Sequence, residues 1–69
     1  MLGNPKYKRG DRVAFEIEMR GEIKIKEGYI EIVDAYGTFF QKKEPSYDIL
    51  VKSENCLYKH IEESLVREL

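Results

Sequence analysis

The chain contains a single cysteine and a single histidine, and it has no tryptophan. One cysteine cannot form an internal disulfide, and a structural zinc site needs about four cysteine, histidine or carboxylate ligands. Neither of the cross-links that commonly stabilise small domains is therefore expected. The fold must be stabilised by packing of its apolar side chains or by self-association.

The sequence also lacks long apolar runs and an excess of charge of one sign. No segment approaches the ~20 apolar residues of a membrane-spanning helix, and the first residues contain no signal-peptide core. Lysine and arginine number 12 against 13 acidic residues, so the net charge of −1 gives no overall attraction to nucleic acid. We expect a reduced, cytoplasmic protein without membrane contact, metal or cofactor, with a polar tail at 1–6 and one domain at 7–69.

Alternation of apolar and polar residues predicts β-strands along much of the chain. Residues 13–19 read VAFEIEM, and residues 22–26 read EIKIK. In the second segment we expect Ile23 and Ile25 to face the core and the two lysines to face solvent. Arg20-Gly21 between the segments predicts a hairpin turn.

Two registers of this hairpin are compatible with the sequence. A loop of residues 19–21 sets Glu16 opposite Lys24, whereas a loop of residues 20–22 sets Glu16 opposite Lys26 and Glu18 opposite Lys24. The two registers differ by an even step, so both bury the same faces.

The hydrophobic pattern changes phase at Gly28. Ile23 and Ile25 occupy odd positions, whereas Ile30 and Ile32 occupy even ones, and we expect both pairs to face the core. A β-bulge or sharp bend at Gly28 would reconcile them. The strand is expected to continue to about Tyr36.

The C-terminal third predicts a second hairpin. Residues 46–51, SYDILV, are rich in strand formers, and a loop of residues 53–55 would place Asn55 at a position that tolerates positive φ. This register pairs Tyr47 with Ile61 and Val51 with Leu57.

The last residues permit two structures. Apolar residues recur every fourth position at Leu57, Ile61, Leu65 and Leu69, as in an amphipathic helix, which would give an α+β fold. We favour a strand, a short helical turn at 61–64 and a last strand at 65–69, because the strand at 46–51 needs a partner.

The segments KRGDRVAF, GYIEIVDAYG, SYDILV and CLYKHIEESLV together resemble the SH3-like small β-barrels, in the broad sense that includes Tudor, Agenet and KOW-type modules. Small phage and prophage proteins look similar. The resemblance implies an all-β barrel of about five strands, with a short helical turn before the last strand and a non-enzymatic binding function. It implies no particular ligand, because the chain has no tryptophan for a proline-rich groove and no recognisable aromatic cage.

Cys56 and His60 lie four residues apart, as two metal ligands or a thiolate–imidazole couple could. Two ligands do not complete a zinc site, and a cysteine nucleophile also needs an orienting group and an oxyanion hole. We expect no catalytic or metal site, and a chemically quiet thiol with His60 oriented by Asp48.

Exposed aromatic residues are the first candidate binding site. Phe39 and Phe40 are neighbours, and a strand sends neighbouring side chains to opposite faces. One phenylalanine is therefore predicted to pack with Ile30 and Ile32, and the other to lie exposed beside Tyr36. Because exposed aromatic residues often anchor interfaces, we predict that Tyr36, Phe39 and Phe40 contact another protein.

Basic residues supply an alternative binding site, for RNA or DNA. They cluster near the N-terminus and in the loop after the aromatic residues, at Lys6, Lys8, Arg9, Arg12, Lys42 and Lys43. A third possibility is a structural barrel that associates with itself through an exposed strand edge, so that the protein is a monomer or a weak homodimer.

Overall fold

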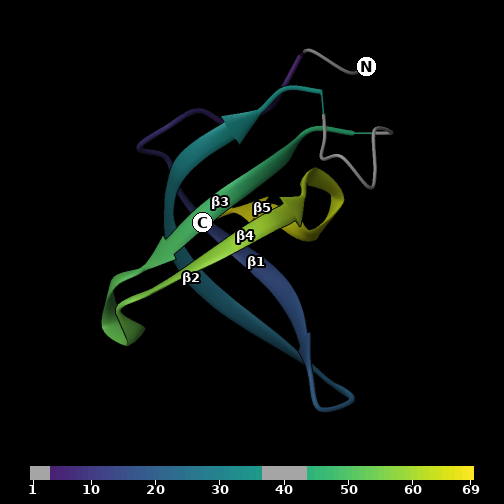
Figure 1. Cartoon of the computed structure of the whole chain (residues 1–69), viewed down its shortest axis with the longest axis vertical. Helices are drawn as coiled ribbons and strands as arrows, with labels where there is room; N and C mark the ends of the chain where they lie inside the picture. Colours follow the sequence, from purple (N-terminus) through teal and green to yellow (C-terminus); the bar gives the residue numbers. More distant parts are fainter. Residues whose placement is uncertain (1–3, 37–43) are drawn as a thin grey trace.

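Five β-strands form one antiparallel sheet in the computed structural model, which describes residues 4–36 and 44–69 (Figure 1). The strands are β1 Arg12–Met19, β2 Glu22–Asp34, β3 Ser46–Val51, β4 Cys56–Glu62 and β5 Val66–Glu68. Two 3₁₀ turns complete the described chain: η1, Lys52–Glu54, joins β3 to β4, and η2, Glu63–Leu65, precedes β5.

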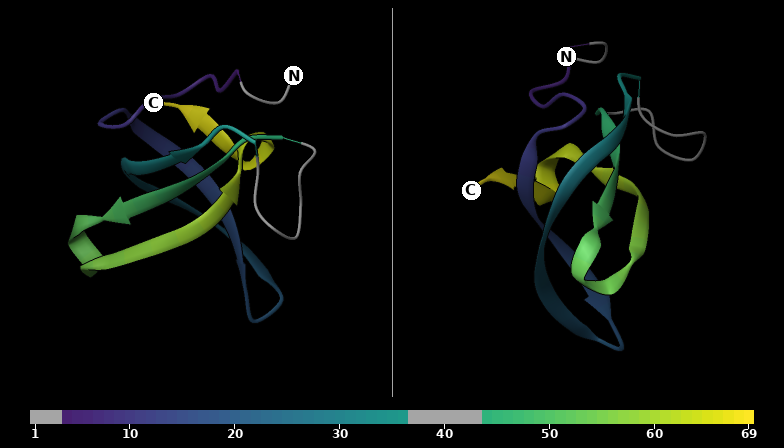
Figure 2. Two further views of the ribbon diagram at one scale, coloured as in Figure 1. Left: turned by 45° about the horizontal axis from the view of Figure 1, so that its top comes forward. Right: turned by 90° about the vertical axis from the view of Figure 1, so that its left-hand side faces the viewer.

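The sheet has the order β4-β3-β2-β1-β5 and curls into a small open barrel (Figures 1 and 2). The predicted all-β class, with a short helical turn before the last strand, is confirmed. The alternative of a C-terminal helix is wrong, because residues 56–62 pair with β3 as β4. As a helix, this segment would have left β3 without a second hydrogen-bonding neighbour.

Apolar side chains from all five strands form the core. Phe15 and Ile49 are completely buried, and Tyr47 lies beside them. The other buried members of the cluster are Val13, Ile30, Val51, Ile61 and Val66. Among the described residues, no buried side-chain nitrogen or oxygen lacks a hydrogen-bond partner. The small core is therefore apolar, and the buried polar atoms of the described side chains all have hydrogen-bond partners.

The β1–β2 hairpin has a register that differs from both predictions. Met19 lies opposite Glu22 across a two-residue turn, in which Arg20 has φ 54° and Gly21 has φ 81°. Positive φ at both turn residues is the geometry that suits the twist of a tight hairpin. The register sets Ile17 opposite Lys24, one residue away from either predicted register.

This one-residue difference reverses the faces of the first half of β2. Lys24 and Lys26 lie on the side of the sheet that faces the core, opposite Ile17 and Phe15. Ile23 and Ile25 face outward and are 63% and 54% exposed. The prediction of inward isoleucines and outward lysines is therefore wrong.

Gly28 does not lie at a bulge, contrary to the prediction. It pairs with Val13 within an unbroken β1–β2 ladder. Lys26, Gly28 and Ile30 share one face, so no phase change occurs there. A Cβ atom at Gly28 would lie 2.5 Å from the Leu50 carbonyl oxygen and 2.8 Å from Ile49 Cγ2. Glycine is needed because β3 approaches closely.

The irregularity in β2 lies three residues further on, in the pairing with β3. The register shifts between Ile30 and Ile32, which leaves Glu31 as the extra residue. A bulge of this kind reverses the faces that follow it. Val33 consequently packs against the core, and Ile32, which was predicted to be buried, is 53% exposed.

The β3–β4 hairpin agrees with the sequence at its open end and differs near its turn. Tyr47 pairs with Ile61, as predicted, but Val51 pairs with Cys56 and not with Leu57. Asn55 has φ 52°, as predicted, but the loop contains the whole of η1 as well. It is therefore one residue longer than the predicted loop of residues 53–55.

A bulge in β4 absorbs the difference between the two ends of this hairpin. The register shifts between Tyr47 and Ile49, and His60 has φ 61°. The backbone N–H of His60 donates a hydrogen bond of 3.0 Å to Asp48 Oδ1. Asp48 was predicted to orient His60, and the contact observed between them is this hydrogen bond to the His60 main chain.

Two tyrosines attach the N-terminal segment to the barrel. The rings of Tyr7 and Tyr47 meet edge to face at a centroid distance of 5.7 Å, and the Tyr7 N–H donates to the Tyr47 hydroxyl at 3.3 Å. That hydroxyl donates to Glu63 Oε2 at 2.6 Å, and the Lys6 N–H donates to the same oxygen at 2.9 Å. Burial, followed by the hydrogen bond to Glu63, raises the pKa of the Tyr47 phenol well above its ordinary value.

Gly28→Ala is expected to lower the free energy of unfolding by about 1–3 kcal/mol, because the added methyl group would collide with the β3 backbone. Urea denaturation of the two proteins measures the difference. Lys24→Ala, on the same face of β2 but exposed, is the control and should stay within about 0.5 kcal/mol of the wild type. Equal stability of the Gly28→Ala variant would contradict the close approach of β3.

Tyr47→Phe is expected to cost about 1–2 kcal/mol, because the Tyr7 N–H loses its acceptor and Glu63 loses a donor. Amide hydrogen exchange should also become faster at Lys6 and Tyr7. Tyr36→Phe removes an exposed hydroxyl and should change neither quantity. Unchanged exchange at both amides in Tyr47→Phe would show that the tyrosine does not hold the N-terminal segment.

Candidate functional site

The predicted aromatic contact site lies only partly within the described residues. Tyr36 is 70% exposed just after β2, and its backbone N–H donates to Asp34 Oδ1 at 3.1 Å. Phe39 and Phe40 lie outside the described residues. Ile30, one of the two predicted partners of a buried phenylalanine, is in the core, whereas the other, Ile32, is exposed.

The basic residues near the N-terminus do not form a purely cationic surface. Within the described chain, Lys6, Lys8 and Arg9 form no side-chain ion pair, but Arg12 Nη2 contacts Glu27 Oε1 at 3.1 Å. A hollow of about 270 Å³ beside them is lined by Lys6, Tyr7, Asp11, Arg12, Val13, Glu68 and Leu69. Its cations and carboxylates are balanced, so it has no net preference for phosphate. Lys42 and Lys43 lie outside the described residues.

Cys56 and His60 are not brought together as a couple. The bulge places an extra residue in β4, so Lys59 and His60 are both exposed, whereas Cys56 is half-buried opposite Val51. In residues 4–36 and 44–69, no group of three or more histidine, cysteine, aspartate or glutamate side chains could hold a metal ion. The described chain thus offers no zinc-type ligand set.

An apolar surface that the sequence did not reveal lies on the outer face of the sheet. Ile32 of β2, Leu50 of β3 and Leu57 of β4 line a hollow of about 510 Å³, together with Arg9 and Glu31. We call Ile32, Leu50 and Leu57 the outer apolar patch. Ile32 and Leu57 remain substantially exposed, and Leu50 is half-buried between them.

The outer apolar patch depends on the two irregular pairings of the sheet. Leu50 lies directly opposite Leu57, so the two side chains stand on the same face. Ile32 joins them only because the register shift at Glu31 turns it outward. Neither irregularity is marked by a glycine or a proline, and this is why the pattern of alternation did not predict the patch.

The surroundings of the outer apolar patch carry charges of both signs. Arg9 and Glu31 line its hollow. Lys52 lies over the ring of Tyr29, with Nζ 4.7 Å from the centroid, and Tyr29 is the cross-strand neighbour of Leu50. This arrangement can desolvate apolar side chains of a ligand and orient its charged groups. Among the described residues that line the hollow, Arg9 and Glu31 carry the charged side chains.

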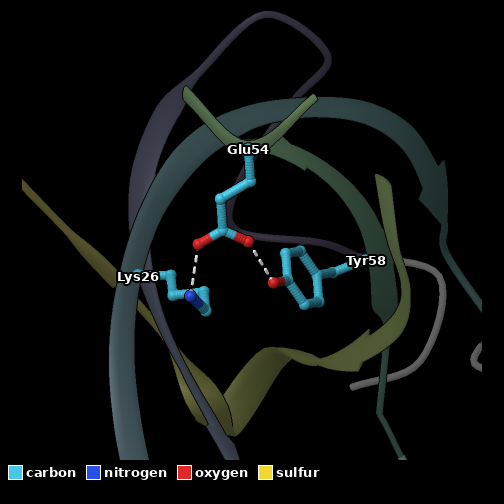
Figure 3. Close-up of polar contacts among 3 residues, drawn as sticks. All are labelled: Lys26, Glu54 and Tyr58. Atoms are coloured by element: carbon cyan, nitrogen blue, oxygen red, sulfur yellow. Dashed lines mark hydrogen bonds and ion pairs between the residues drawn. The ribbon is translucent and has the colours of Figure 1, made fainter. Parts of the chain in front are cut away.

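A cluster of three polar side chains lies where β2, η1 and β4 meet (Figure 3). The carboxylate of Glu54 is held between two groups: Lys26 Nζ forms an ion pair with Oε2, and the Tyr58 hydroxyl donates to Oε1. The Lys26 ammonium also lies 5.8 Å from the centroid of the Tyr58 ring. These contacts stabilise the lysine on the core-facing side of β2.

The Lys26–Glu54–Tyr58 cluster shifts the titration of its three groups. The hydrogen bond from Lys26, followed by that from Tyr58, lowers the pKa of Glu54 below its ordinary value. The hydrogen bond to Glu54 is also the main cause that raises the pKa of Lys26 and the pKa of Tyr58. Each of the three groups forms a hydrogen bond or an ion pair with another member of the cluster. The arrangement therefore joins η1 to β2, and none of its three groups is a free acid or base.

Comparison with protein-family models, with curated proteins and with solved structures finds no match to this chain. Within the described residues, none of the helical segments has the length and apolar character needed to cross a membrane.

Glu54→Gln is expected to destabilise the protein most near neutral pH. Because the folded-state pKa of Glu54 is lowered, its ionisation stabilises the fold above the ordinary value of 4.5, and this contribution is lost as the pH falls through the folded-state pKa. The difference in urea midpoint between wild type and Glu54→Gln should therefore narrow as the pH is lowered from 7 to 3. Glu18→Gln, at an exposed carboxylate, is the control. A Glu54→Gln difference that is constant across this range would show that the cluster does not stabilise the fold.

Proposed function

We propose that this chain is a small, non-enzymatic binding module that recognises another protein through the outer apolar patch. The observation that carries the proposal is the meeting of three aliphatic side chains from three adjacent strands in one hollow on the surface. Single exposed aliphatic residues are common on protein surfaces, but a contiguous apolar surface with polar groups around it is typical of an interaction site.

We further propose that the module is of the SH3-like kind. The strand order β4-β3-β2-β1-β5 and the 3₁₀ turn η2 before β5 support this assignment. Barrels of this type act as binding modules, and the exposed apolar side chains of the outer apolar patch support the same role here. The fold alone does not specify the ligand, so the partner must be argued from the surface.

The chemistry of the outer apolar patch favours a peptide segment with apolar side chains. Leu50 and Leu57 provide a surface that a leucine, isoleucine or aromatic side chain could cover. Arg9 and Glu31 could then pair with an acidic and a basic residue of the same segment. Tyr36, which is exposed, remains a predicted additional contact.

Nucleic-acid binding is the alternative, and the unpaired side chains of Lys6, Lys8 and Arg9 favour it within the described chain. Two features weaken it. Arg12 is already paired with Glu27, and the net charge is −1. A surface of this kind would bind a phosphate backbone weakly and with a small dependence on salt.

The proposal is tested with a displayed library of random peptides selected on the immobilised protein. Selected peptides are titrated into the isotopically labelled protein, and the amide shifts are mapped by NMR. We expect the largest shifts at Ile32, Leu50 and Leu57, and Leu57→Lys should weaken binding by about tenfold or more.

Ile23→Lys is the matched control, because it also replaces an exposed aliphatic residue with lysine but lies outside the outer apolar patch. It should leave peptide affinity unchanged. Selection of no binding peptide, or shifts confined to other surfaces, would overturn the proposal. Shifts at Lys6, Lys8 and Arg9 on addition of a single-stranded oligonucleotide, without peptide binding at the patch, would establish the alternative.

A further inference from the structure

The outer half of the β1–β2 hairpin extends beyond the strands that flank it (Figures 1 and 2). β5 pairs with β1 only at Val13–Phe15, and β3 pairs with β2 only from Tyr29 onward. Residues 16–19 and 22–25 therefore form a two-stranded ribbon, and residues 26–28 continue the edge of β2 that β3 leaves unpaired. An isolated two-stranded ribbon is marginally stable in water unless another element covers it.

The ribbon has a free hydrogen-bonding edge along β2. The pair Met19–Glu22 closes a two-residue turn, and in such hairpins the closing pair exchanges both backbone hydrogen bonds. Alternation then directs the N–H and C=O groups of Ile23, Ile25 and Glu27 away from β1. Within the described chain, no strand pairs with β2 at these residues.

The side chains along this edge are unusual for an unpaired strand. Ile23 and Ile25 are more than half exposed on the outer face. Natural edge strands are commonly protected by bulges, prolines or charged side chains. Residues 22–27 contain neither a bulge nor a proline, and the lysines that protect this edge lie on the core-facing side, so the outer face keeps its two isoleucines. The edge thus combines free backbone groups with exposed β-branched side chains.

We propose that a second copy of this chain pairs antiparallel with the β2 edge at residues 22–27 and forms a two-fold symmetric dimer. The proposal is independent of the outer apolar patch, which lies on the part of β2 that pairs with β3. In the register that we assign, Ile23 lies opposite the partner's Ile25, and Ile25 lies opposite the partner's Ile23. The four isoleucines then form one continuous apolar strip.

The order of charges along residues 22–27, EIKIKE, supports a second copy as the occupant. In this register Glu22 lies opposite the partner's Lys26, whose ammonium is shared with Glu54 of its own chain, and the symmetry repeats that pair. Lys24 lies opposite the partner's Lys24 at the two-fold axis. Two pairs of opposite charge thus accompany one pair of like charge, which predicts a weak dimer with a defined register.

Sedimentation equilibrium of the full chain, over a roughly hundredfold range of concentration, measures the association. We expect the weight-average mass to rise from monomer towards dimer. Hydrogen exchange at the amides of Ile23, Ile25 and Glu27 should slow as the concentration rises. The double variant Ile23→Thr and Ile25→Thr keeps strand-forming residues and should weaken the dimer by about tenfold or more.

Two further variants make the test specific. Leu57→Thr, in the outer apolar patch, should leave the dimer unchanged. Lys24→Thr should strengthen it by roughly two- to fivefold, because the like-charge pair at the axis is removed. A protein that stays monomeric throughout overturns the proposal, as does a dimer that survives the double isoleucine variant. Weakening of the dimer by Lys24→Thr would overturn the assigned register.

Discussion

The close approach of β3 to Gly28 is the constraint on which the rest of the structure depends. A side chain at this position would meet the Leu50 carbonyl, so Gly28 faces inward, and Ile30 follows it into the core on the same face. The β1–β2 ladder is regular from Arg12 to Met19. The alternation of inward and outward side chains along β2 therefore continues without interruption from Gly28 to the turn. Two residues then remain for the turn itself, and Arg20 and Gly21 adopt the positive φ that so short a connection requires.

This alternation directs a lysine toward the core and two isoleucines toward solvent. Both placements cost free energy, and contacts within the molecule compensate only for the lysine. Lys26 is directed to the core side of the sheet, where Glu54 and Tyr58 supply a counter-charge and a ring, and this in turn holds the η1 turn against β2. Ile23 and Ile25 are directed outward, and both remain more than half exposed. A bulge at Gly28 would have buried these isoleucines, but it would have disturbed the contact between β2 and β3. The proposed second copy of the chain would bury these exposed isoleucines.

The strands could be predicted from the sequence, but the faces of several residues could not. Alternation located β1 and the start of β2, strand-forming residues located β3, and Asn55 marked the turn into β4 through its tolerance of a left-handed backbone. Alternation does not reveal where a strand gains an extra residue, and the bulges at Glu31 and His60 carry no local signal of glycine or proline. For this reason Ile32 was assigned to the wrong face, and Leu57 was paired with Val51 when its partner is Leu50. The outer apolar patch, which is built from them, could not be found before the register was known.

The two proposed surfaces occupy different halves of β2, and this separation has a functional consequence. The outer apolar patch uses the half that pairs with β3, whereas the free edge belongs to the ribbon beyond Gly28. A dimer joined through the ribbons would leave both copies of the patch open and hold them at a fixed separation. Each patch alone is small, so a single contact with a peptide would be weak. Two patches on a rigid dimer would bind a partner with two matching segments much more tightly than either alone, provided that the spacing of the segments fits. Self-association would in that case set the strength of partner binding without adding any contact to the patch.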